Sequence, residues 1–129
     1  MRHPLRVRLA MLLLVATTAP GAVAADDVSF ERDVLPVLNS RCVMCHLPGA
    51  ALGGLSLYPD ARASLVGVAS TQSPLKLVEP GAPDSSYLYL KLTGTQDPAS
   101  GQPMPPTGLL DAAEIGLLRR WIEQGAAGN

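Results

Sequence analysis

The chain has 129 residues, which is the length of a single domain, and its formal net charge is −1. It holds twelve glycines and twelve prolines but only one Phe, one Trp and three Tyr, which indicates a small core between long loops. No cluster of basic residues is present to bind phosphate, so a role in nucleic-acid binding is disfavoured.

The first 25 residues have the three parts of a cleavable signal peptide. A leader with three arginines precedes the apolar run 9–16, and Ala22-Val23-Ala24 fits a small-residue cleavage site. The apolar run is shorter than the roughly 17 to 25 residues that span a bilayer, although an uncleaved anchor is the alternative. We therefore expect export to the periplasm, with cleavage after Ala24 or Ala25.

The mature chain, residues 26–129, would be one acidic domain. Cleavage removes Arg2, Arg6 and Arg8, which leaves seven basic residues against eleven acidic ones and a net charge of −4. We expect no membrane span in this part of the chain. A partner that is steered by charge should present a basic face.

A predicted helix begins with Ser29 as its N-cap and runs toward the first cysteine. Pro36 interrupts it, so we expect the helix to kink or to restart there. Its apolar residues recur at helical spacing and should face the core: Phe30, Val34, Leu35, Val37 and Leu38.

The five residues Cys42-Val43-Met44-Cys45-His46 match the Cys-x-x-Cys-His attachment pattern of c-type haem. Two thiols one helical turn apart can each add to one vinyl group of the same porphyrin. The histidine that follows is then held under the iron as its proximal ligand. A covalently attached porphyrin would also supply the large apolar centre that a loop-rich chain needs. We expect one haem c, bound through Cys42, Cys45 and His46.

Three other uses of these cysteines stay open. A redox disulfide normally accompanies a βαβ pattern, which the sequence lacks. A structural zinc site needs four Cys or His ligands, whereas the chain has two of each and His3 lies in the leader. A structural disulfide between Cys42 and Cys45 would close a very short loop and stabilise the fold little.

The middle of the chain is predicted to be mostly loop. Residues 47–49 and 53–54 contain helix-breaking Pro and Gly that allow close approach to a ligand. Residues 55–58 are expected to be a short extended piece, and 60–66 a short helix closed by a glycine. Residues 68–83 are predicted to be loop that ends in a Glu-Pro-Gly turn.

A third helix is predicted from Ser86 to about Leu92, capped by Asp84 or Ser85 and stopped by Gly94. The spacing of its apolar residues should turn four of them inward: Tyr87, Leu88, Leu90 and Leu92.

The last helix is predicted to begin with a capping box formed by Asp111 and Glu114, and to end at Gly125. Its buried stripe should consist of Ile115, Leu118, Trp121 and Ile122.

Met104 is the candidate for the second iron ligand. His46 is the only histidine of the mature chain, which excludes two histidine ligands from one chain. Met1 and Met11 lie in the leader, and Met44 is too close to His46 in sequence to reach the opposite face of a haem.

Two lysines, Lys76 and Lys91, could ligate iron only when neutral, and losing the proton at pH 7 costs roughly 4 to 5 kcal/mol. A thioether has no such cost. The prolines around Met104 also stiffen its loop, so little entropy is lost on placing the sulfur. The alternative is that Met104 fills a gap in the core.

The order of these motifs resembles that of the class I c-type cytochromes, and the residues within them resemble those of the planctomycete-type cytochrome c domain. The resemblance covers about Phe30 to Ala126 and depends on segments 30–38, 42–46, 53–57, 79–86, 104–108 and 121–126. It implies an all-α fold, the small cytochrome c fold, with crossing N- and C-terminal helices and long loops around one covalent haem. It also implies Cys42 and Cys45 as thioether residues, His46 as proximal ligand and Met104 as distal ligand.

We therefore expect a monohaem cytochrome that carries single electrons, with no enzymatic activity of its own. Its partners would be redox proteins, whether dehydrogenase, reductase or oxidase, and it would be a free carrier or a subunit. The alternative is a haem protein that binds or senses a gas by displacing Met104. A peroxidase-like enzyme usually needs a distal histidine, and the mature chain has none to offer.

Overall fold

The computed structural model describes residues 26–129. The expected signal peptide 1–25 and its cleavage site after Ala24 or Ala25 lie outside the described residues. Residues 26–129 form four α-helices: α1 (Leu35–Arg41), α2 (Ala61–Leu65), α3 (Tyr87–Thr93) and α4 (Ala112–Glu123). Shorter helical turns are formed by Phe30–Val34, Leu52–Gly54, Pro83–Ser85 and Pro98–Ser100.

The regular structure of residues 26–129 is entirely helical, as predicted. Pairing between extended segments is limited in this range to isolated bridges, Val66 with Val78, Ala69 with Lys76, and Lys76 with Ser86. The expected extended piece at 55–58 does not become a strand. None of the helices in this part of the chain is both long and apolar enough to cross a membrane.

The first helix has the predicted cap and the predicted break. The Ser29 hydroxyl accepts a hydrogen bond from the Arg32 N–H at 3.2 Å. Pro36 lies in the first turn of α1. Because proline has no N–H and its ring crowds the carbonyl four residues back, the preceding residues Phe30–Val34 form a wider π-type turn. The chain then continues as α1 and ends at the first cysteine.

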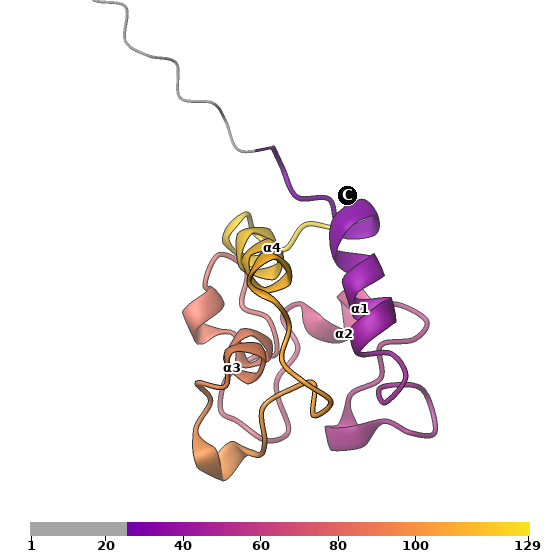
Figure 1. The fold of residues 1–129 in the computed structure, drawn as a ribbon, viewed down its shortest axis with the longest axis vertical. Coiled ribbons are helices and arrows are strands. Elements are labelled where there is room, and N and C mark those ends of the chain that lie inside the picture. Colours follow the sequence, from indigo (N-terminus) through magenta and orange to yellow (C-terminus); the bar gives the residue numbers. More distant parts are fainter. Residues whose placement is uncertain (1–25) are drawn as a thin grey trace, which may run out of the picture.

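The first and last helices contact one another, as predicted. The rings of Phe30 and Trp121 lie 5.3 Å apart between centroids and are tilted by 38°. Val34 and Leu118 are fully buried in the same core. Figure 1 shows α4 beside the first helix, which runs down the picture.

The last helix begins with the predicted capping box. The Asp111 carboxylate accepts from the Glu114 N–H at 2.8 Å, and the Glu114 carboxylate accepts from the Asp111 N–H at 3.0 Å. Leu118, Trp121 and Ile122 are buried, whereas Ile115 is only partly so.

The third helix departs from the prediction at its start. Its N-cap is Ser86, not Asp84 or Ser85, because Pro83–Ser85 form a separate turn. The Ser86 hydroxyl points inward instead, where it accepts from the Glu79 N–H and donates to the Ala82 carbonyl, both at 2.9 Å.

The set of buried residues on α3 also differs in part from the prediction. Tyr87 and Leu92 are buried as predicted, but Leu88 and Leu90 are only partly buried. Two residues that were not predicted to face inward, Tyr89 and Lys91, are buried. The helix ends at Gly94, whose φ of +70° is the left-handed conformation that glycine adopts without strain.

Candidate cofactor site

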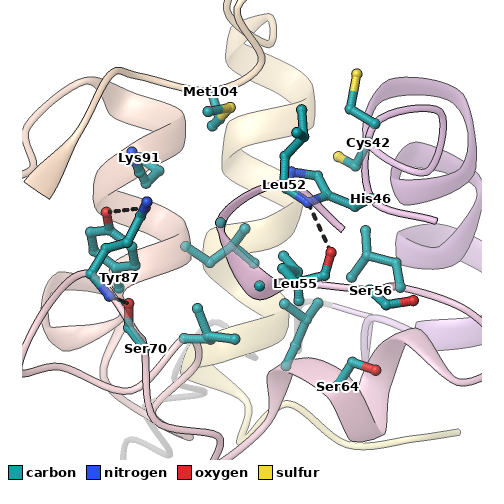
Figure 2. A pocket seen from close by; sticks show the side chains of 18 of the residues that line it. Cys42, His46, Leu52, Leu55, Ser56, Ser64, Ser70, Tyr87, Lys91 and Met104 are labelled. Carbon is teal, nitrogen blue, oxygen red and sulfur yellow. Dashed lines mark hydrogen bonds between the residues drawn. The ribbon is translucent and has the colours of Figure 1, made fainter. Parts of the chain in front are cut away.

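A cavity of about 780 Å³ lies between α1, α2, α3, the segments that join these helices, and the loop between α3 and α4. The four residues predicted to hold a cofactor, Cys42, Cys45, His46 and Met104, all line it. Most of the remaining lining is apolar, and its volume is typical of a ligand pocket. Figure 2 shows His46 and Cys42 at one side of this cavity and Met104 at another.

The cysteine motif folds as a tight turn at the end of α1. The Cys42 N–H still bonds the Leu38 carbonyl at 2.9 Å, and the His46 N–H bonds the Val43 carbonyl at 3.0 Å. The turn therefore brings His46 back beside the helix end that carries Cys42. Both thiols are free, with Cys42 half-buried and Cys45 exposed.

Burial raises the pKa of the Cys42 thiol to about 11. A redox-active cysteine needs the opposite, a lowered pKa that makes the thiolate available at neutral pH. Residues 26–129 also contain no group of three or more His, Cys, Asp or Glu side chains arranged to hold a metal ion. The raised pKa of Cys42 argues against the redox-disulfide alternative.

The His46 ring is oriented by the backbone of a distant residue. Its Nδ1 lies 3.1 Å from the Leu55 carbonyl oxygen, and a dashed line joins these two residues in Figure 2. A carbonyl can only accept, so Nδ1 carries the hydrogen and Nε2 keeps its lone pair for a metal. The Leu57 N–H bonds the His46 carbonyl at 2.8 Å, which fixes the same segment to the motif a second time.

Met104 is held by α3. Its N–H donates to the Lys91 carbonyl at 2.9 Å, and the side chain is half-buried at the cavity wall. Met44, by contrast, is 81% exposed and does not line the cavity. The prediction that Met44 cannot serve as the second ligand agrees with this placement.

One end of the cavity is polar, which the sequence did not predict. The Lys91 ammonium donates to the Gln102 carbonyl at 2.6 Å, and the Tyr87 hydroxyl donates to the Ser100 carbonyl. A Cβ atom at Gly101 would lie 2.9 Å from Lys91 Nζ, so the loop passes very close to the ammonium. Figure 2 shows Lys91 and Tyr87 together at this end of the cavity. Their spacing of four residues on a helix is the only signal in the sequence that could have paired them.

Comparisons of the chain with protein families, with curated proteins and with solved structures found no significant match. The chemistry of the site must therefore be inferred from its own residues.

The donor set is able to hold one covalently attached haem. His46 offers a neutral nitrogen and Met104 a soft thioether, both of which suit haem iron. Cys42 and Cys45 offer two thiols beside that histidine, and the apolar lining suits a large aromatic ring.

Proposed function

We propose that this chain is a monohaem c-type cytochrome of the class I kind, which transfers single electrons in the periplasm. The observation that carries the proposal is that His46, with Nδ1 satisfied and Nε2 free, lines the same apolar cavity as Met104, Cys42 and Cys45. The contact between the first and last helices supports the small cytochrome c fold that the motif order implies.

The two thiols would attach the cofactor. Each adds across one vinyl group, so that a C–S bond forms and the thiol hydrogen passes to the neighbouring vinyl carbon, with no net oxidation. The haem iron, when bound, supplies the one-electron chemistry. Cys42 and Cys45 fix the ring beside α1 and thereby bring His46 to the iron.

His46 and Met104 would set the properties of the iron. The hydrogen bond from His46 Nδ1 to the Leu55 carbonyl makes Nε2 a better donor and fixes its direction. Met104 is neutral and soft, so it favours the ferrous state and raises the reduction potential. The Met104 backbone is bonded to Lys91 on α3, so the segment that carries the thioether is anchored beside the cavity, which favours an electron carrier over a gas sensor.

Electron exchange would take place through uncharged residues at the cavity, Leu52 and Pro105, and two uncharged residues close to them or to His46 in the chain, Ala51 and Leu47. We call these four residues the rim. Leu52 is 61% exposed, Ala51 is exposed, and Leu47 and Pro105 are half-buried. Such a rim loses little hydration when a partner covers it, and the net charge of −4 on residues 26–129 would attract a basic partner.

The test is an absorption spectrum of the exported protein, produced in a host that attaches haem c, in both oxidation states. We expect a covalent haem that resists acid extraction and a sulfur-to-iron charge-transfer band in the ferric form. Met104→Leu should lose this band, whereas the matched variant Met44→Leu should keep it. A wild type without covalent haem would overturn the proposal, and a Met104→Leu variant that keeps the band would overturn the assignment of the second ligand.

A further inference from the structure

Lys91 is a buried cation. Only 6% of its surface is exposed, although lysine is almost never buried without a charged partner. Its ammonium bonds the Gln102 carbonyl and lies 5.4 Å from the centroid of the Tyr87 ring, and both of these neighbours are uncharged.

No acidic side chain within residues 26–129 pairs with Lys91. The five ion pairs in this range use other cations: Arg32, Arg41, Lys76 and Arg119, the last of them twice. A buried charge without a counter-ion costs several kcal/mol, more than one neutral hydrogen bond returns. An anion bound in the cavity that Lys91 lines would supply the counter-ion that the described residues do not.

The cavity beside Lys91 has positive charge and no negative charge. Its lining includes Arg41 and Lys91 but neither Asp nor Glu, although residues 26–129 carry an excess of acidic residues. Arg41 is already paired with Glu114 at 3.8 Å, whereas Lys91 has no such partner. The lining thus fits an occupant that is apolar over most of its surface and anionic at the end near Lys91.

We infer that the Lys91 ammonium forms an ion pair with one propionate carboxylate of the bound haem. The inference rests on the proposed function, because it concerns the same cavity and the same cofactor. Lys91 would then have two roles. Its carbonyl accepts a hydrogen bond from Met104, and its ammonium keeps the propionate carboxylate ionised, so that the charge near the iron does not change with pH.

The reduction potential tests this pairing. In the wild type the paired carboxylate stays ionised above about pH 5, so it adds no pH dependence between pH 5 and 8. In Lys91→Gln the carboxylate has no cation beside it and becomes protonated within this pH range. It takes up the proton more readily when the iron is ferrous than when it is ferric. The potential of the variant should match the wild type at low pH and shift below it as the pH rises. The matched control is Lys76→Gln, which removes the same charge from an exposed lysine paired with Glu79 at 2.7 Å.

Five other titratable groups line the cavity, and both the wild type and the Lys76→Gln control keep all five, so neither differs from Lys91→Gln in them. In the holoprotein the two cysteines would be thioethers and the histidine would be bound to iron. The five groups are Cys42, Cys45, His46, Arg41 and Tyr87.

Infrared spectra of protein with ¹³C-labelled propionates give a second readout. Lys91→Gln should gain a protonated-carboxyl band at neutral pH that both the wild type and Lys76→Gln lack. Lys91→Met, which also removes the charge, should behave as Lys91→Gln does. If neither variant folds, the wild type alone decides: protonation of both labelled carboxyls above about pH 5 would overturn the inference.

The two proposals can fail separately. A wild type with covalent haem and a Lys91→Gln variant whose potential follows the wild type at every pH would leave the cytochrome proposal intact and refute the ion pair. A wild type without haem would refute both.

Discussion

The contact between Phe30 and Trp121 joins the two ends of the domain, and its energy can be measured directly. Trp121→Leu removes an indole that is 1% exposed, the ring contact with Phe30, and the hydrogen bond from Nε1 to the Ala127 carbonyl at 2.9 Å. Lost apolar burial, lost aromatic pairing and one lost hydrogen bond together should reduce the free energy of unfolding by about 3 kcal/mol. For a domain of this size that corresponds to a fall in Tm of roughly 12 to 24 °C.

The aromatic pairing itself is isolated by a double-mutant cycle with Phe30→Leu. We expect a coupling energy of about 0.5 to 1.5 kcal/mol from denaturant unfolding of the holoprotein, followed by far-ultraviolet circular dichroism because Trp121 is the only tryptophan. Trp121→Phe keeps a ring against Phe30 but loses the hydrogen bond, so it should cost only about 1 to 2 kcal/mol. A coupling energy of zero between Phe30→Leu and Trp121→Leu would show that the helices do not meet through these rings.

Three further predictions concern the cofactor, the cap and the rim. Cys42→Ala with Cys45→Ala should bind no haem covalently and lose the cooperative thermal transition; a transition near that of the wild type would show that the fold does not need the cofactor. Asp111→Ala should reduce the free energy of unfolding by about 1 kcal/mol, whereas Asp111→Asn, which can still cap the helix, should change it little. Ala51→Glu should slow electron self-exchange, measured by NMR on mixed oxidation states, while the spectrum stays unchanged. Glu123→Gln, at the C-terminal end of α4, should alter only the salt dependence of that rate. Equal rates for Ala51→Glu and wild type would show that electrons leave through another edge of the haem.

The sequence predicted those features that depend on residues close together in the chain. Ser29 and Asp111 were recognisable as caps because each is followed within four residues by the groups that it bonds. The start of α3 was not, since Asp84, Ser85 and Ser86 are all good cap residues and differ only in their tertiary contacts. Ser86 is buried and bonds Glu79, seven residues away, which the local pattern does not encode.

Two parts of the candidate site were also beyond sequence reasoning. The carbonyl that orients His46 belongs to Leu55, and every residue has a carbonyl, so no residue type marks this role. Lys91 was considered only as a competing iron ligand, because a lysine on a helix is ordinarily solvated. Its burial results from the way in which the loop around Gln102 folds over α3.

The backbone at Gly101, where the loop passes closest to Lys91, has an evolutionary consequence. Gly101 has φ +92° and ψ −176°, a conformation open almost only to glycine. A Cβ atom there would lie 2.9 Å from the Lys91 ammonium, but that group is the end of a flexible side chain and can move aside. The backbone constraint does not depend on the residue at position 91. Homologues should therefore keep glycine at 101 whether or not they keep the lysine at 91.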